Sequence, residues 1–216
     1  METQNILGSF STEGLTFDPE KHVYRVKGIP IPSVTQLMKP LSTSVYNGID
    51  ESILQAAADK GTAVHSAIEF FLKYGIAEYP EQHKGYFDAF LCWYRDNNPE
   101  IILTESMTYH KQLLYAGTVD LVAKVNGLNT LIDYKTTTVI HDMLTTVQLE
   151  AYQRALATNE VKVEQKAILQ LRQDGTYSFK VYQANDLEAW KTFSALITIQ
   201  GHMIRYGGGY YHANHH

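Results

Sequence analysis

The 216-residue chain has a single cysteine, Cys92, and it has no long apolar run. One thiol cannot form an internal disulfide, a four-cysteine zinc site or a four-cysteine iron–sulfur cluster. The apolar stretches are too short to span a bilayer. Residues 1–10 also lack the basic and then apolar pattern of a signal peptide. We therefore expect a cytoplasmic protein with no membrane partner.

Positive charge is also scarce, since the chain has 18 Lys and Arg but 23 Asp and Glu, and its formal net charge is −5. Proteins that coat nucleic acid through broad electrostatic attraction are usually basic, so this balance argues against that mode of binding. It leaves open a carboxylate-rich site whose field is offset by divalent cations. The apolar content of 44% indicates a globular chain with a full hydrophobic core.

Hydrophobic periodicity and turn signals predict a mixed order of helices and strands. Residues 17–32 form a hairpin with a turn at Lys27-Gly28, and Ser33 caps a short helix that Pro40 ends. Residues 41–50 are predicted to be irregular. Helical periodicity covers residues 50–74, 81–97, 145–159 and 187–206, the last capped by Asn185. Strand patterns cover residues 101–110, 113–125, 128–137, 163–172 and 176–183.

This order predicts the α/β class, with a mixed central β-sheet flanked by helices in one domain of residues 1–216. Its parts are the hairpin at 17–32, a helical part at 50–98, a core at 101–185, a C-terminal helix at 186–206 and a loose tail at 207–216. The tail carries His212, His215 and His216, which could bind metal, although a solvated tail fits its composition better.

Two strands joined by Asn126-Gly127, the preferred pair for a two-residue hairpin turn, carry an unusual set of charges. A turn of two residues places Asp120 directly across from Asp133, with their Cβ atoms roughly 5 Å apart. A wider loop over residues 126–129 would place Asp120 opposite Lys135 instead. Both registers leave Asp120, Asp133 and Lys135 on one face, because strand side chains alternate.

Two neighbouring carboxylates repel each other and resist desolvation, so a purely structural role for them is costly. A divalent cation removes the conflict, and hard carboxylate oxygens suit Mg²⁺ or Mn²⁺. Lys135 adds a positive charge near an attacking water or a phosphate oxygen. The alternative is a cross-strand ion pair between Asp120 and Lys135, with Asp133 facing solvent. On the opposite face, four neighbours are expected to be buried together: Val119, Leu121, Ile132 and Tyr134.

Three further segments offer polar side chains for such a site. His65 and Glu69 lie four residues apart on one helix, as do Gln148 and Tyr152 on another. Histidine is a common metal ligand, and a glutamine or tyrosine can hydrogen-bond a phosphate, but each could equally be an ordinary helix residue. Glu105, one strand before the hairpin, is a candidate third acid, with a water-facing edge-strand glutamate as the alternative.

Together these residues resemble the PD-(D/E)XK nuclease superfamily, in particular its RecB-like, phage-type exonuclease branch. The signature is an acid on one strand and acid-x-Lys on the next, here Asp120 and Asp133-Tyr134-Lys135. The branch also carries a helical histidine before the core, here His65, and a Gln-x-x-x-Tyr helix after it, here residues 148–152. The resemblance covers about residues 17–185, and Val119 stands where the family name has proline.

The resemblance implies a restriction-endonuclease-like fold and a metal-dependent DNA exonuclease of phage or bacterial recombination or repair. Mg²⁺ or Mn²⁺ would be bound by His65, Asp120, Asp133 and the Tyr134 backbone carbonyl. Lys135 would orient the attacking water, Glu105 would be a further catalytic acid, and Gln148 and Tyr152 would position the DNA.

The same resemblance implies DNA as the partner, as linear duplex or single-stranded ends, and cooperation with a single-strand annealing or recombination protein. Two alternatives stay open. One is an endonuclease or flap nuclease of the same fold, and the other is a protein of that fold that binds DNA or a partner without cutting. The oligomeric state does not follow from the sequence.

Overall fold

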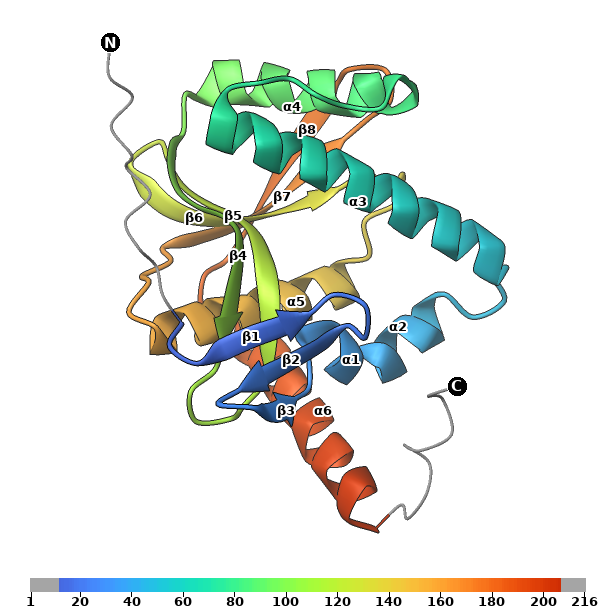
Figure 1. Cartoon of the computed structure of the whole chain (residues 1–216), viewed down its shortest axis with the longest axis vertical. Coiled ribbons are helices and arrows are strands. Elements are labelled where there is room, and N and C mark those ends of the chain that lie inside the picture. The colour runs from blue at the N-terminus through green and yellow to red at the C-terminus, as the bar shows by residue number, and fades with distance from the viewer. Residues whose placement is uncertain (1–11, 207–216) are drawn as a thin grey trace.

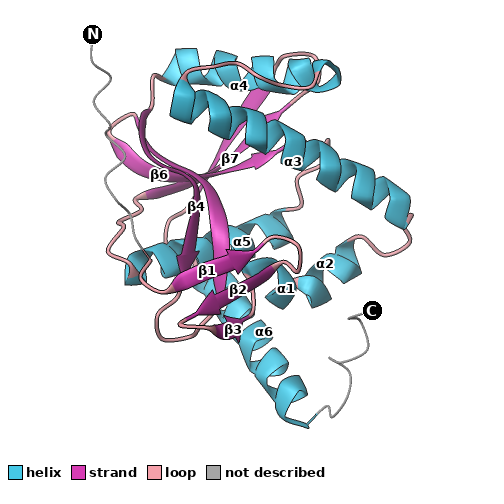
Figure 2. Cartoon of the chain, in the orientation of Figure 1, coloured by secondary structure: helices cyan, strands magenta, loops and turns pink. Residues whose placement is uncertain are grey.

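The structure, a computed structural model, describes residues 12–206 and is centred on a five-stranded β-sheet (Figures 1 and 2). Its strands are adjacent in chain order: β4 (Glu100–Tyr109), β5 (Ala116–Val125), β6 (Leu128–Lys135), β7 (Gln165–Leu171) and β8 (Tyr177–Tyr182). All neighbours are antiparallel except β6 and β7, which are parallel. The predicted mixed sheet of the α/β class is confirmed.

Helices cover both faces of this sheet. On one face lie α3 (Glu51–Tyr74) and α4 (Lys84–Asn97), preceded by a 3₁₀ turn (Glu81–His83). On the other lie α5 (Asp142–Thr158), which connects the parallel strands, and α6 (Leu187–Tyr206). The predicted ends of the five strands and four long helices agree with these bounds to within three residues.

Two hydrophobic cores hold these layers together. On the α3 and α4 side, Phe90 and Trp93 pack against Ile132 of the sheet, and all three are fully buried. On the α5 and α6 side, Leu149 and Phe193 are equally buried in the other core. Burying a large apolar side chain contributes about 1.5–3 kcal/mol relative to leaving it exposed, so both layers are held firmly against the strands that carry the acids.

Helix α3 extends beyond the sheet. Asp50 caps its start by accepting a hydrogen bond from the Ser52 N–H at 2.8 Å, and Gly75, with φ of 70°, ends it in the left-handed conformation. Its buried residues, Val64, Ala67 and Ile68, lie in the second half, so residues 51–63 project as an arm (Figure 1).

The N-terminal part is a second sheet of three strands, β1 (Leu15–Asp18), β2 (Val23–Val26) and β3 (Ile29–Ile31). The predicted hairpin contains β2 and β3, whereas the strand β1 was not predicted. The Ala116 N–H donates to the Pro32 carbonyl at 2.9 Å. The small sheet is thereby attached to the start of β5.

The segment after the first short helix, α1 (Val34–Leu37), differs from its prediction. Ser33 caps α1 in a reciprocal arrangement with Gln36, as the sequence suggests. Residues 41–50 were expected to be irregular, but α2 (Lys39–Val45) begins at once, with Pro40 in its first turn. Proline is favoured there because the first helical N–H groups have no partner inside the helix. The prediction that Pro40 only ends a helix was therefore incomplete.

The cap of α6 was also assigned wrongly. Asn185 has φ of 57° and belongs to the preceding turn. The side chain of Asp186 makes the cap by accepting a hydrogen bond from the Ala189 N–H at 3.0 Å. Asn and Asp have similar preferences for the N-cap position, so the sequence does not show which of the two adjacent residues caps the helix.

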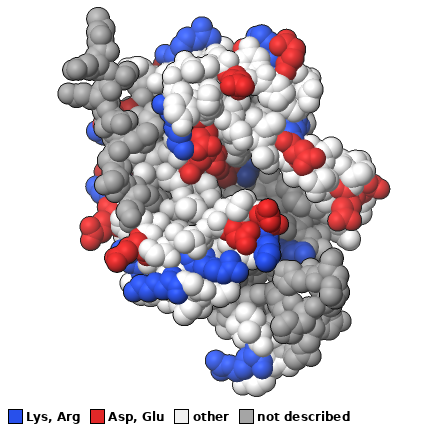
Figure 3. Space-filling view, in the orientation of Figure 1, with Lys and Arg blue, Asp and Glu red and all other residues white. Residues whose placement is uncertain are grey.

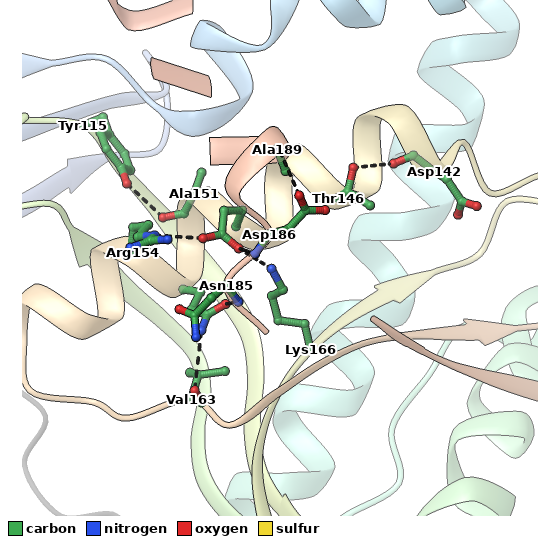
Figure 4. A network of polar contacts seen from close by, with 12 residues as sticks. Tyr115, Asp142, Thr146, Ala151, Arg154, Val163, Lys166, Asn185, Asp186 and Ala189 are labelled. Carbon is green, nitrogen blue, oxygen red and sulfur yellow. Dashed lines mark hydrogen bonds and ion pairs between the residues drawn. The ribbon is translucent and has the colours of Figure 1, made fainter. Parts of the chain in front are cut away.

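A buried polar network fixes α5 against β7 and α6. Figure 4 shows the Lys166 and Arg154 side chains converging on one carboxylate. That carboxylate belongs to Glu150, which pairs with both residues and also accepts a hydrogen bond from the Asp186 N–H at 2.9 Å. Glu150 and Lys166 are almost completely buried, so breaking this pair is costly. The network holds the helix that carries Gln148 and Tyr152 at a fixed position.

Within residues 12–206, no helix has both the length and the apolar composition that crossing a bilayer requires. The predicted tail at 207–216, with its three histidines, lies outside the described residues.

Candidate active site

The hairpin between β5 and β6 has the two-residue turn. Val125 pairs with Leu128 and Leu121 with Ile132, so Asn126 and Gly127 alone form the turn. Both turn residues have positive φ, 50° and 84°, as the favoured hairpin turn requires. The tight register is confirmed and the wider loop is wrong. Counting on in this register, Asp120 lies opposite Asp133.

The two strands separate where the acids begin. The paired register ends at Leu121 and Ile132, and the Tyr134 N–H donates to Asp120 Oδ2 at 2.7 Å. A side-chain carboxylate thus takes the place of a backbone acceptor from β5. The prediction that Val119 and Leu121 are buried together is wrong, because Val119 packs in the α5 core while Leu121 packs in the α3 core. Strand alternation is interrupted at Asp120.

Glu105 lies on β4, the neighbour of β5 on the side away from β6, and is opposite Asp120. The pairs Thr104 with Leu121 and Ser106 with Val119 bracket it, and Glu105 itself has φ of 40°. A non-glycine residue in the left-handed region costs on the order of 1–3 kcal/mol. This conformation accompanies a carboxylate turned into the site, with 18% of the side chain exposed. The water-facing alternative for Glu105 does not describe this structure.

His65 on α3 joins these two acids. Its Nδ1 atom lies 3.3 Å from Glu105 Oε1 and 3.6 Å from Asp120 Oδ1. One ligand atom from each of the three residues lies within 4.8 Å of the others. The ring of Tyr134 meets His65 edge to face at 5.3 Å between centroids and limits its rotation. Glu69, one turn along α3, pairs with Lys73 instead and does not join the cluster.

Asp133, Lys135 and Gln148 form the adjoining half of the site. Lys135 Nζ lies 2.7 Å from Asp133 Oδ2, while Gln148 Nε2 donates to Asp133 Oδ1 at 3.0 Å. Gln148 Oε1 accepts from Lys135 Nζ at 3.2 Å. The alternative of an Asp120–Lys135 pair with a solvent-facing Asp133 is wrong, because Asp133 is buried and pairs with Lys135. The amide of Gln148 fixes both charged groups.

The electrostatics of the cluster favour bound protons when no cation is present. Burial opposes protonation of His65, but Asp120 and Glu105 outweigh it and raise the pKa of His65 to about 9. Burial raises the pKa of Asp120 to about 7, with His65 opposing and Asp133 adding to the rise. Burial also lowers the pKa of Lys135, yet Asp133 more than offsets it and holds the value above the usual one. Lys135 is therefore a cation and hydrogen-bond donor here.

The residues present fit a divalent cation. Glu105 Oε1 and Asp133 Oδ2 are buried oxygens that receive no hydrogen bond in the described part of the chain. Lys135 forms an ion pair with Asp133 Oδ2 at 2.7 Å. Buried carboxylate oxygens without donors are costly unless a cation compensates them. The donor set of carboxylates and one imidazole suits Mg²⁺ or Mn²⁺.

Tyr152 lies against the same site from α5, but its ring is not open to solvent. It is only 6% exposed, and a Cβ placed on Gly117 would lie 2.6 Å from its Cε1 atom. Burial raises the pKa of its hydroxyl, and Asp120 and Asp133 act in the same direction. Tyr152 can therefore offer a hydroxyl and not a stacking surface. Gly117 is required because the ring crosses the backbone of β5 there.

Some residues at the site were not predicted. The Tyr24 hydroxyl of β2 lies 2.9 Å from Thr118 Oγ1, next to the acids on β5. Tyr46 after α2 and His141 before α5 meet edge to face on the other side of Lys135. No local pattern marks them, because their proximity arises from tertiary packing of segments about 95 residues apart. On the face shown in Figure 3, acidic side chains border the hollow beneath α3.

The sequence of residues 85–201 matches the family model of the PD-(D/E)XK nuclease superfamily. This match covers more than half of the chain and includes all three acid-bearing strands, β4, β5 and β6, and the Gln148 helix. The chain belongs to the PD-(D/E)XK nuclease superfamily. It is therefore in a class of hydrolases that act on nucleic acid and generally depend on divalent metal. None of the curated proteins matches the chain significantly.

Among solved structures, the chain is similar to an alkaline exonuclease, LHK-Exo, from Laribacter hongkongensis. The match has 11% identity and a TM-score of 0.44, and it covers 66% of this chain and 80% of that one. A structure of LHK-Exo in complex with dAMP matches with 12% identity, a TM-score of 0.39 and coverage of 82% and 90%. Likeness at this level carries no argument about activity, so the family assignment depends on the sequence match.

Proposed function

We propose that this protein is a Mg²⁺- or Mn²⁺-dependent deoxyribonuclease that hydrolyses phosphodiester bonds from DNA ends. The observation that carries the proposal is the cluster of His65, Glu105 and Asp120, whose ligand atoms lie within 4.8 Å of one another beside the Asp133–Lys135 pair. We further propose phage or bacterial recombination or repair as its setting, with a single-strand annealing or recombination protein as a partner.

Each residue has a role in this proposal. His65, Glu105 and Asp120 would hold the cation together with Asp133, and the Tyr134 carbonyl stays a predicted ligand. The cation would stabilise negative charge that develops on the scissile phosphate. Lys135 donates hydrogen bonds from its ammonium group to the attacking water or to a phosphate oxygen. Gln148 holds Lys135 and Asp133 in place, because it bonds to both.

The space around the cluster supports action on one strand at a time. The hollow beneath the α3 arm has a volume of about 270 Å³ and is lined by Gly61, His65 and Lys135 among others. A hollow of that size accepts one nucleotide of a strand more readily than an uninterrupted duplex. Entry of a free strand end past α3 would make the enzyme an exonuclease.

The test is cleavage of end-labelled linear DNA and of circular single-stranded DNA, each with Mg²⁺, with Mn²⁺ or with EDTA. We expect linear DNA to be shortened only with a cation, and circular DNA to stay intact. Asp133→Asn is expected to lower the rate at least about 100-fold, since it weakens the cation site and the Lys135 pair. Asp88→Asn, which changes a surface acid on α4, is the matched control and should cleave like wild type.

The outcomes separate the alternatives. Absence of cleavage by wild type with either cation, or equal cleavage by Asp133→Asn, contradicts the proposal. Cleavage of the circle would favour an endonuclease or flap nuclease. DNA binding that is unaffected by the cation, with no cleavage, would favour a binding protein of this fold. Labelled RNA of the same sequence tests the preference for DNA.

A further inference from the structure

A separate apolar hollow adjoins Lys135 on the side away from His65. Its volume is about 320 Å³, and it lies between α1 and α2 on one side and the start of α5 on the other. The segment from Thr137 to His141 closes a third side. Apart from Lys135 and Gln148, the residues of this hollow, which we call the side pocket, have no role in the proposed chemistry.

The side pocket has an apolar interior and a polar edge. Met38 and Leu144 are almost buried and form its floor, and Ile140 packs beside them. Tyr46 and His141 form an aromatic corner, with ring centroids 5.5 Å apart and an interplanar angle of 87°. Hydroxyl and amide groups line the remaining wall. No acidic residue is among the described residues that line it.

Two residues connect the side pocket to the proposed catalytic centre. Lys135 and Gln148 line the pocket, and both contact Asp133. Lys135 also lines the hollow beneath α3 that contains His65. A nucleotide whose phosphate meets Lys135 at the acids therefore has its attached base within reach of the side pocket.

We propose that the side pocket binds one unpaired nucleobase of the nucleotide adjoining the scissile phosphate. A base has apolar faces that stack on aromatic and aliphatic side chains, and polar edges that suit hydroxyl and amide groups. A base inside a duplex is paired and stacked, so it enters such a pocket only after leaving the helix. The enzyme then selects single strands or frayed ends. This inference rests on the proposed function and names the substrate class of the same site.

The first test measures binding without cleavage, in EDTA, by calorimetry. The probes are deoxyadenosine 5′-monophosphate and 2-deoxyribose 5-phosphate, in which a hydroxyl group replaces the base. Wild type is expected to bind the nucleotide at least about fivefold more tightly, the lower range of what one stacked base contributes. Ser42→Phe fills the pocket from α2 and should remove this preference. Ser44→Phe, on the exposed face of the same helix, is the matched control and should keep it.

The second test uses single-stranded oligonucleotides with one abasic nucleotide moved stepwise along the chain, cleaved in Mg²⁺. Cleavage by wild type and Ser44→Phe should slow at least about fivefold at the bond beside the abasic nucleotide and at no other bond. Ser42→Phe should cleave normal and abasic strands equally slowly.

If wild type binds the two probes equally tightly, the base pocket is overturned. It is also overturned if Ser42→Phe and Ser44→Phe show the same preference for the nucleotide over the sugar phosphate. Uniform cleavage past the abasic nucleotide also overturns it. If wild type cleaves no strand at all, the proposed function fails instead, and the calorimetric comparison still decides whether the pocket binds a base.

Discussion

The carboxylate of Asp120 accepts a hydrogen bond from the backbone N–H of Tyr134 at 2.7 Å. In the register of the hairpin, a regular ladder would supply that acceptor from the Val119 backbone. One oxygen of Asp120 thus completes the sheet, and the other faces His65 at 3.6 Å. The same side chain therefore keeps the two strands joined and offers an oxygen to a cation.

Two substitutions at Asp120 should separate these roles. Asp120→Asn keeps an acceptor for the Tyr134 N–H but loses the charge, so we expect a stable fold and a loss of activity of at least about 100-fold. Asp120→Ala also leaves a buried N–H without a partner, which costs about 1–3 kcal/mol of unfolding free energy. Urea denaturation and cleavage rates measure the two effects. Equal stability of the two variants would show that the Tyr134 hydrogen bond is not needed.

The metal-free protein should lose stability as the pH rises. The pKa of His65 is about 9 in the folded state, above its usual 6.5, so its contribution is complete below pH 6.5 and lost through pH 9. The pKa of Asp120 is about 7, above its usual 3.8, so its contribution has the same sign and is lost through pH 7. One pKa unit corresponds to about 1.4 kcal/mol, so the total loss is on the order of a few kcal/mol.

This pH dependence is measured by urea denaturation at pH 5, 7 and 9 in EDTA and repeated with excess Mg²⁺. We expect the cation to raise the unfolding free energy most at pH 9, because it binds the deprotonated ligands of the folded state. His65→Gln should remove the His65 contribution and leave a loss from Asp120 alone, shifted to higher pH because His65 no longer opposes the rise of the Asp120 pKa. A stability in EDTA that increases from pH 7 to pH 9 is the contrary result.

Gln148 is expected to act by positioning Asp133 and Lys135. Gln148→Ala should lower kcat about 10- to 100-fold and change KM by less than about threefold, since lost support of ligands has effects of that size. Gln148→Glu should be worse, because it places another carboxylate beside Asp133 and cannot donate. Steady-state kinetics on a labelled oligonucleotide distinguish the roles. A raised KM at constant kcat would mean that Gln148 binds DNA directly.

Two helical glycines provide a matched test of the packing around the sheet. A Cβ on Gly85 of α4 would lie 1.8 Å from the Gln173 carbonyl oxygen, whereas Gly201 of α6 has nothing within 4 Å. We expect Gly85→Ala to reduce the unfolding free energy by about 1–3 kcal/mol through overpacking. Gly201→Ala should raise it by up to about 1 kcal/mol, because alanine favours helix. Thermal melts of both variants check this. An unchanged melting temperature of Gly85→Ala would contradict the close packing of α4 against Gln173.

The fold could be predicted where local rules decide the structure. The Asn126-Gly127 turn determined the hairpin register, and capping and periodicity located α3 between Asp50 and Gly75. Local rules failed where neighbours in space override them. Strand alternation predicted Val119 beside Leu121, but the break in the ladder at Asp120 separates them into two cores.

The candidate site could be predicted as a set of residues but not as an arrangement. Glu105 was an ambiguous acid in sequence, because only the β4–β5 register and its positive φ turn it toward His65. Gln148 was expected to touch DNA, and the structure shows it bonded to Asp133 and Lys135. Such contacts depend on the position of α5, which the buried ion pair between Glu150 and Lys166 fixes against β7. No local residue spacing predicts this pair.

We propose that His65, Glu105 and Asp120 bind one divalent cation beside Asp133. The most direct measurement is the anomalous scattering of a crystal soaked with Mn²⁺. We predict a peak at coordination distance, about 2.0–2.3 Å, from His65 Nδ1 and from oxygens of Glu105 and Asp120. Full Mn²⁺ occupancy elsewhere in the crystal, with no peak among these three residues, would contradict it.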